Sequence, residues 1–191
     1  MLVSSARLLV RSTMPHLILS VLGPDRPGLV GALSATVRDH HGNWLESRMA
    51  KLAGQFAGVV RVDVSEDEVG RLDDALKGLA QQGLVVTVNR DADGTATAGT
   101  ATPPRQLHVG MLGLDRPGVV RDLAHALAVR GLNITELTSR VRSAPMSGEL
   151  LFEAQVTLAA PNDADVDGLR EQLEQLAEQL DMDLAFETEE A

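Results

Sequence analysis

The chain has 191 residues and a formal net charge of −10, with 2% aromatic residues and no cysteine. Direct binding of DNA or RNA is not expected, because it needs clustered Lys and Arg and often aromatic platforms for stacking bases. The lack of cysteine excludes disulfides and cysteine–zinc sites and favours a reducing, cytoplasmic location, and no apolar run reaches the roughly 18 residues of a membrane-spanning helix.

Residues 1–14 form a short segment that contains arginine but no acidic side chain. Its apolar run is too short for a secretory signal and is interrupted by arginine. We expect a disordered extension, since chain ends are generally held loosely, and Met14 is an alternative start of the natural protein.

Residues 15–90 contain six predicted elements in the order strand, helix, strand, strand, helix, strand. Apolar residues at every third or fourth position mark the helices, and alternation of apolar and polar residues marks the strands. Pro27 is expected in the first helical turn, Gly42 in a left-handed cap, Gly54–Gln55 in a hairpin turn, and Ser65 as a side-chain cap. The predicted strands are 16–22, 44–53, 56–64 and 84–88, with helices beginning near residues 27 and 66.

The turn after the first strand occurs twice in the chain. Residues 22–28 read Leu-Gly-Pro-Asp-Arg-Pro-Gly, and residues 112–118, which lie 90 positions later, read Leu-Gly-Leu-Asp-Arg-Pro-Gly. The apolar face of the following helix repeats with the same offset, so the chain contains two copies of one module. At the second helix the offset is 97, and we place most of the seven extra residues in a loop over 143–148.

The segment 91–105 is rich in Ala, Thr, Gly and Pro and is predicted to be a linker. Residues 106–188 then form the second module, and 189–191 form an acidic tail. A β-α-β-β-α-β order makes a four-stranded antiparallel sheet with both helices on one face. The predicted fold class is therefore α+β, with two ferredoxin-like modules.

Both copies resemble ACT domains, which are small-molecule regulatory modules of many amino-acid enzymes and regulators. The resemblance rests on an apolar strand, an Asp-x-Pro-Gly turn, a helix, and an Asn 18 positions after the Asp: Asp25 with Asn43, and Asp115 with Asn133. A chain of two such modules without an enzyme domain is similar to the glycine cleavage system transcriptional repressor family. This resemblance implies a non-enzymatic homo-oligomer that senses a small amino acid and controls a separate regulator protein or enzyme by contact.

The resemblance places the ligand where the turn after the first strand faces a neighbouring module. Helix N-terminal N–H groups suit the ligand carboxylate, Asp suits its ammonium group, and Gly permits close approach to the backbone. Arg could bind the carboxylate with two hydrogen bonds, and Asn can donate and accept. The predicted ligand-binding residues are Asp25, Arg26, Gly28, Asn43, Asp115, Arg116, Gly118 and Asn133.

A structural interpretation of the same residues remains open. Each Asp would then cap its helix, Pro and Gly would only shape the turn, and each Asn would only tolerate an unusual backbone angle. Trp44 follows Asn43 where Ile134 follows Asn133, and this bulky ring is expected to fill or reshape the first pocket. The second site is therefore favoured over the first.

No nucleotide-binding or catalytic motif occurs, and the histidines lack metal-ligand spacing. We therefore expect no enzymatic activity, no cofactor and no metal. The acidic helix over 163–180 is either a solvated face or a docking surface for a basic partner. The alternative function is a ligand-free scaffolding module in a complex of amino-acid metabolism.

Overall fold

The computed structural model describes residues 15–91, 105–160, 162 and 165–187. The chain divides into two compact units, with the boundary between residues 99 and 100. The predicted extension 1–14, the interior of the predicted linker 91–105 and the predicted tail 189–191 lie outside the described residues.

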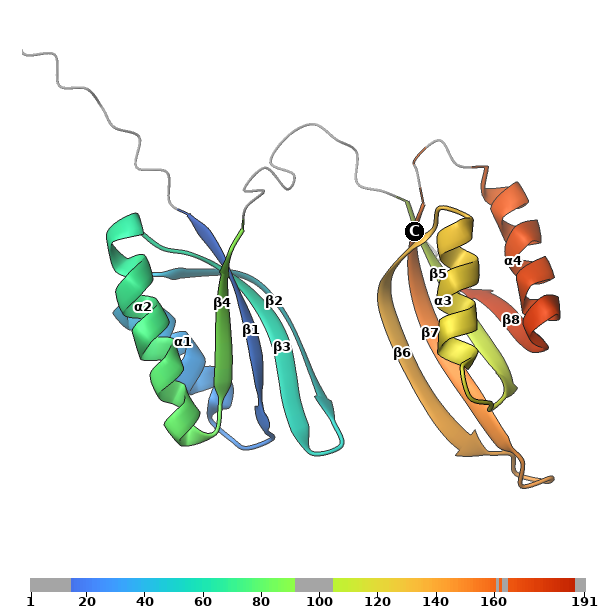
Figure 1. Cartoon of the computed structure of the whole chain (residues 1–191), viewed down its shortest axis with the longest axis horizontal. Helices are drawn as coiled ribbons and strands as arrows, with labels where there is room; N and C mark the ends of the chain where they lie inside the picture. The colour runs from blue at the N-terminus through green and yellow to red at the C-terminus, as the bar shows by residue number, and fades with distance from the viewer. Residues whose placement is uncertain (1–14, 92–104, 161, 163–164, 188–191) are drawn as a thin grey trace, which may run out of the picture. The chain divides into compact units, whose positions relative to one another are not determined.

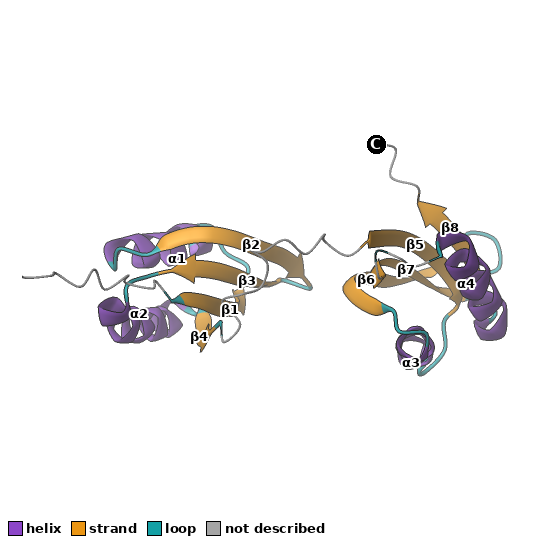
Figure 2. Cartoon of the chain, turned by 90° about the horizontal axis from the view of Figure 1, so that it is seen from above, coloured by secondary structure: helices purple, strands orange, loops and turns teal. Residues whose placement is uncertain are grey.

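The first module folds in the order β1-α1-β2-β3-α2-β4, with a short 3₁₀ helix, η1, before its last strand. Its strands form one antiparallel sheet in the order β2-β3-β1-β4, and both helices lie on the same face (Figure 1 and Figure 2). The bounds are β1 His16–Pro24, α1 Leu29–Asp39, β2 Asn43–Leu52, β3 Gln55–Asp63, α2 Glu66–Gly78, η1 Leu79–Gln82 and β4 Val85–Arg90.

The second module repeats this order and topology, with a sheet in the order β6-β7-β5-β8. Its two helices also share one face of the sheet (Figure 2). The predicted α+β class with two ferredoxin-like modules is therefore confirmed. The bounds are β5 Arg105–Leu114, α3 Val119–Val129, β6 Asn133–Ser143, β7 Leu150–Ala160, α4 Val166–Leu180 and β8 Met182–Glu187.

The core of each module lies between its sheet and its helices. In the first module, Leu33 and Val37 of α1 are buried against strand residues such as Leu19 and Val60. The predicted apolar positions that recur at every fourth residue of the first helix are buried in both copies, because they fall on one face of a 3.6-residue repeat. Val30, which was expected beside them, is 45% exposed. These positions are Leu29, Leu33 and Val37 in α1 and Val119, Leu123 and Leu127 in α3.

The hairpin between the second and third strands accounts for most of the length difference between the modules. Asn43 pairs with Asp63 in the first module, and Asn133 pairs with Ala159 in the second. The offset therefore grows from 90 to 96 across this hairpin, so six of the seven extra residues lie in it. The short hairpin turns at Ala53 and Gly54, both with positive φ, so the turn lies one residue earlier than predicted.

Two helix-cap predictions are wrong in detail. The left-handed residue after α1 is His41 (φ 57), and not Gly42. Gly42 is needed for space, because a Cβ there would lie 2.9 Å from Cγ1 of Val37. Ser65 does precede α2, but its hydroxyl makes no capping hydrogen bond.

Candidate functional site

The two repeated turns share one backbone conformation. Gly28 and Gly118 precede α1 and α3 in the left-handed region, with φ of 93° and 89°. Only glycine adopts this region without cost, and a Cβ at either position would meet no atom within 4 Å. The space over both turns is therefore open. Pro27, which was expected inside the helix, lies just ahead of its first residue, Leu29.

No side chain caps either of these helices. The alternative interpretation, in which Asp25 and Asp115 cap these helices, is therefore not supported. Backbone N–H groups of a first helical turn have no intrahelical acceptor, and the helix dipole adds positive potential there. The N–H of Val119 donates to the Arg116 carbonyl at 3.3 Å. A helix start with unpaired N–H groups suits the carboxylate of an external ligand.

The two aspartates tie their turns to the neighbouring hairpin through the backbone. The N–H of Asp25 donates to the Gly54 carbonyl at 2.9 Å, and the N–H of Asp115 donates to the Leu150 carbonyl at 2.8 Å. Both bonds hold the turn against the end of the adjacent strand. These backbone bonds do not involve the carboxyl groups of the two aspartates.

The two aspartate side chains have different surroundings. The Asp25 carboxylate forms an ion pair with the ammonium group of Lys51 on β2. The corresponding residue of β6 is Val141, and no ion pair of Asp115 is found within the described ranges. Of the two turn aspartates, Asp115 is therefore the one without an ion-pair partner in the part of the chain that the structure describes.

Arg26 turns toward the second helix of its module. Its guanidinium donates to the carbonyl of Gln82 at the end of η1. Carbonyls at a helix end lack intrahelical partners, so this bond stabilises the helix terminus. The contact requires Gly83, because a Cβ there would collide with the guanidinium.

Arg116 makes a different contact. It donates to Asp122 in the first turn of α3 at 2.7 Å, and Arg121 donates to the same carboxylate at 2.9 Å. These hydrogen bonds, that of Arg116 first, lower the pKa of Asp122 below its usual value. Ala32 stands at the place of Asp122 in the first module. Both arginines are thus engaged by protein groups, and their predicted role at a ligand carboxylate stays a prediction.

Asn43 and Asn133 lie at the opposite end of their modules from the turns. Asn43 opens β2 opposite Asp63, which pairs with His16 at the beginning of β1, whereas the turn follows the end of β1. The 11 residues of α1 separate the two positions by about 16 Å. The structure therefore does not bring the Asp and the Asn of one module together.

Trp44 packs against the core of the first module, as Ile134 does in the second. It follows Asn43 at the end of the module remote from the turn. The expected reshaping of the pocket at the turn by this ring is therefore wrong.

The sequence did not predict a role for Gly23 and Gly113. A Cβ on Gly23 would lie 2.5 Å from the carbonyl oxygen of Gly83, and one on Gly113 would lie 3.0 Å from that of Asp181. These glycines let the end of the second helix approach the strand that leads into the turn. Their repetition within the seven-residue motif was the available signal.

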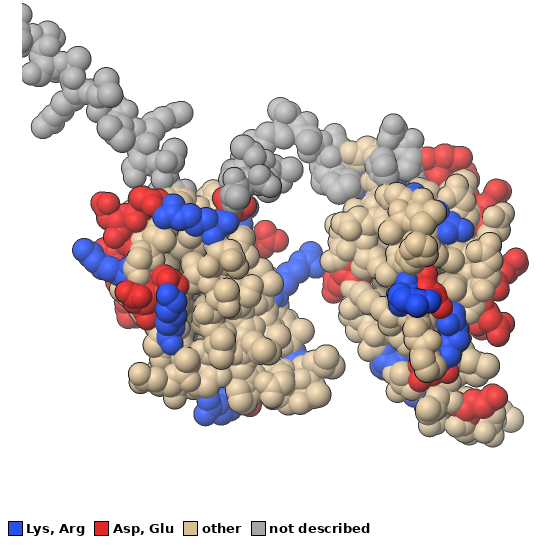
Figure 3. All heavy atoms as spheres, viewed as in Figure 1, with Lys and Arg blue, Asp and Glu red and all other residues tan. Residues whose placement is uncertain are grey.

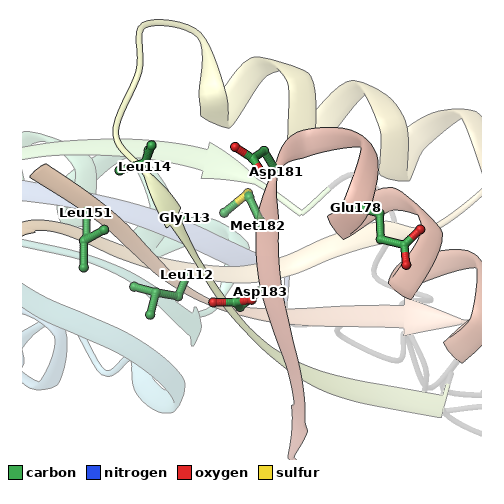
Figure 4. Close-up of a pocket in the computed structure, with 8 residues that line it drawn as sticks. All are labelled: Leu112, Gly113, Leu114, Leu151, Glu178, Asp181, Met182 and Asp183. Carbon is green, nitrogen blue, oxygen red and sulfur yellow. The ribbon is translucent and has the colours of Figure 1, made fainter. Parts of the chain in front are cut away.

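A depression of about 590 Å³ adjoins the end of β5, just before the second turn (Figure 4). In Figure 4 the side chains of Leu112 and Asp183 lie close together across two paired strands. Three carboxylates and three leucines contribute to the wall, so the surface suits an amine-bearing group better than an anion. The lining residues are Leu112, Gly113, Leu114, Leu151, Glu178, Asp181, Met182 and Asp183.

Two kinds of feature are absent from the described residues. Among the helices seen there, none has the length and apolar character needed to cross a membrane. Within the same ranges, no three histidine or acidic side chains are grouped so that they could hold a metal ion.

The family of the chain follows from comparison with known proteins. Residues 15–89 and 105–187 match the model of the ACT domain, and these ranges cover both modules. The chain therefore belongs to the ACT domain family, and the resemblance of the repeated Asp-x-Pro-Gly turns is confirmed.

Two curated relatives show how far the similarity extends. The glycine cleavage system transcriptional repressor of Escherichia coli (strain K12) is 26% identical over 172 residues, covering 88% of this chain and 87% of the relative. The UPF0237 protein MK1213 of Methanopyrus kandleri is 32% identical over 81 residues, covering 41% of this chain and 90% of the relative. Similarity to the repressor thus spans both modules.

Solved structures show the same two-module fold. An unknown protein from Galdieria sulphuraria is 27% identical with a TM-score of 0.74, covering 91% of this chain and 98% of that one. A solved structure that bears the name of a glycine cleavage system transcriptional repressor is 20% identical to this chain, with a TM-score of 0.71. At this identity the similarity shows the fold alone. Tandem ACT modules and homology to a repressor together indicate a regulatory role.

Proposed function

We propose that the chain is a non-enzymatic regulator that binds a small amino acid, such as glycine, and controls a separate transcription activator or enzyme by contact. The name of the Escherichia coli relative supports glycine as the first ligand to test. The net charge of −10 supports control through a protein partner, because an acidic chain is repelled by nucleic acid phosphates.

The observation that carries this proposal is the uncapped helix start behind a left-handed glycine, present in both modules. A free amino acid offers a carboxylate and an ammonium group a few ångströms apart. The helix N-terminus suits the carboxylate, and the nearby aspartate suits the ammonium group. Gly28 and Gly118 leave the space that such a ligand needs.

The second module is the better candidate for the ligand. Asp115 has no lysine beside it, whereas an ammonium ligand at Asp25 would have to displace Lys51. The depression next to the second turn adds the carboxylates of Asp181 and Asp183, which favour a positively charged group. The participation of Asn43 and Asn133 stays a separate prediction.

Regulation through this site follows a linkage rule. The ligand can shift the partner equilibrium only by binding the partner-competent and partner-incompetent states with different affinity. A titration of the partner with and without the amino acid would therefore measure the coupling directly.

A thermal-shift screen of the full chain against the amino acids, starting with glycine and serine, tests ligand binding. A ligand at about 100 times its dissociation constant should stabilise the folded chain by roughly 2.7 kcal/mol. Asp115→Ala should abolish the shift, while Asp167→Ala on α4, an exposed acid, should preserve it. Asn133→Ala tests the separate role of the asparagine.

The scaffolding alternative predicts that no amino acid shifts the melting temperature. A shift that persists in Asp115→Ala would place the ligand away from the second turn. A gel shift of DNA at low salt would contradict the expectation that the chain does not bind nucleic acid directly.

A further inference from the structure

The outer face of each sheet, opposite its helices, differs between the modules. Side chains on this face alternate along each strand with buried ones, and neighbouring strands bring them into rows. The second row from the turn is apolar in the first module and mostly charged in the second. From edge to edge it consists of Ala50, Ala57, Leu22 and Val85 in the first module, and of Arg140, Glu153, Leu112 and Asp183 in the second.

The second module stabilises its outer face with an ion-pair network. Arg140 Nη2 lies 2.8 Å from Glu153 Oε1, and Arg142 Nε lies 2.9 Å from Glu153 Oε2. Charged groups of this kind remain compatible with water. The row through Leu112 therefore stays solvated without a covering partner.

The first module has apolar side chains at the same places. Leu22, Val59, Val85 and Leu52 are 53%, 47%, 57% and 78% exposed. Figure 3 shows the charged groups of this module gathered mainly over α2, with uncharged surface beside it over β4. An exposed apolar cluster of this size often marks an interaction surface. The apolar patch comprises Leu22, Ala50, Leu52, Ala57, Val59 and Val85.

The charges on the rest of this outer face are confined to its far end and to the β2 edge. They are Glu46, Arg48, Arg61 and Asp63, and Arg61 also lies 3.5 Å from Asp91. In a chain with a net charge of −10, this face carries both signs in nearly equal number. A second copy of the chain can therefore approach this face with less repulsion than it meets at the acidic helices.

We propose that the apolar patch docks against the same patch of a second copy, with the outer sheet faces packed together around a two-fold axis. A two-fold interface needs only one self-complementary surface, and an uncharged patch with both charge signs at its border meets that need. Stacked sheets pack about 10 Å apart through such side chains. The association is independent of the ligand site at the second turn.

The size of the face sets the expected strength of this dimer. Four strands about 4.8 Å apart, with roughly nine residues of about 3.3 Å each, give a projected face on the order of 500 Å². Stable interfaces bury about 800 Å² per partner, and weak ones bury less. The dimer is therefore weak and depends on concentration.

Sedimentation velocity of the full chain from about 1 to 200 μM tests the proposal. The wild-type chain should shift from monomer toward dimer across this range. The triple variant Ala50→Arg, Ala57→Glu and Val85→Asp transfers the charged row of the second module onto equivalent strands. It should fold, because the second module carries these side chains there, and it should weaken the dimer at least tenfold.

Val30→Asp is the matched control, because Val30 is 45% exposed on α1, on the other side of the sheet from the patch. This variant should dimerise as the wild type does. A wild-type chain that stays monomeric over the whole range would overturn the proposal. Self-association that is unchanged in the triple variant would overturn it equally.

Crosslinking gives a second test that does not depend on the folding of the triple variant. The chain has no cysteine, so Val59→Cys and Val30→Cys each introduce one reactive thiol. A bismaleimide that spans about 10 Å, the spacing of stacked sheets, should join two copies through Cys at position 59. Equal or greater crosslinking through position 30 would contradict the proposed face.

Discussion

The two modules share the backbone of one turn, yet their side chains beside that turn act differently. Arg26 holds the carbonyl of Gln82, whereas Arg116 holds the carboxylate of Asp122. Two substitutions explain the difference: Ala32 offers Arg26 no carboxylate, and Asp181 replaces the glycine that makes room for Arg26. Repetition of a motif therefore fixes the backbone of a site, while residues outside the motif decide its chemistry.

The same comparison separates the aspartates. Lys51 forms an ion pair with Asp25, whereas the equivalent residue beside Asp115 is the uncharged Val141. On the outer face of the sheets, the first module is apolar where the second carries an ion-pair network. The first module is thus suited to association and the second to ligand binding, and the following predictions test this division.

The largest expected effect is on stability, at the glycines that let the helix end approach the strand. Gly23→Ala should destabilise the first module by roughly 3 kcal/mol, because its Cβ would meet a backbone oxygen at 2.5 Å. Gly113→Ala should cost the second module about 1–2 kcal/mol, since the nearest atom there belongs to the flexible Met182 side chain. Denaturant unfolding, followed by the fluorescence of Trp44 in the first module, measures the loss of stability in Gly23→Ala.

Gly31→Ala is the control for these substitutions. Gly31 lies in α1 with no atom within 4 Å of a Cβ, so alanine should stabilise the helix by about 0.5–1 kcal/mol. Destabilisation by Gly31→Ala of the same size as that by Gly23→Ala would show that steric contact is not the cause.

A smaller loss of stability, equal in the two modules, is expected when the left-handed glycines Gly28 and Gly118 are replaced. Gly28→Ala and Gly118→Ala should each cost about 1 kcal/mol, because both residues have φ near 90° and no steric conflict. Calorimetric unfolding of both variants compares the two modules. A much larger loss at one position would show that its turn is held by contacts the other lacks.

Exchanging the residues beside the aspartates tests the predicted ligand preference. Val141→Lys should lower amino-acid affinity at the second turn about two- to fivefold, the range expected for an exposed ion pair. Lys51→Val should raise affinity at the first turn by a similar factor. Binding titrations of the two variants measure these changes, and a change in the opposite direction for either would contradict the role of the aspartates.

The smallest expected effect is on how the stability of the second module depends on pH under acidic conditions. Hydrogen bonds from Arg140, and then Arg142, lower the pKa of Glu153 below the usual glutamate value of 4.5. A carboxylate with a lowered folded-state pKa stabilises the fold above its unfolded value and loses that contribution as the pH falls through the folded one. Glu153→Gln should therefore make the stability of the second module depend less on pH below about 4.5.

The first module has Ala57 at this position, so its own acid dependence should not change in Glu153→Gln. Trp44 fluorescence reports the first module, and circular dichroism reports both. A change in the acid unfolding seen by Trp44 would contradict this assignment.

The fold could be predicted from the sequence because its signals are local and repeated. Apolar spacing marked the buried faces of α1 and α3, and the repeated turn marked both modules. The side-chain partners could not be predicted, since Arg26 contacts a residue 56 positions away, whereas Arg116 contacts Asp122 in the first turn of the helix that follows it. The remote place of Asn43 does follow from topology, because a helix carries the chain from one end of the sheet to the other.

The most direct test of ligand binding at the second turn is a calorimetric titration of glycine into the full chain, Asp115→Asn and Asp25→Asn. The substitutions keep side-chain shape and remove the charge that would hold an ammonium group. We predict saturable binding to the wild-type chain, at least tenfold weaker binding to Asp115→Asn, and nearly unchanged binding to Asp25→Asn. Equal binding to the wild-type chain and Asp115→Asn would contradict the account.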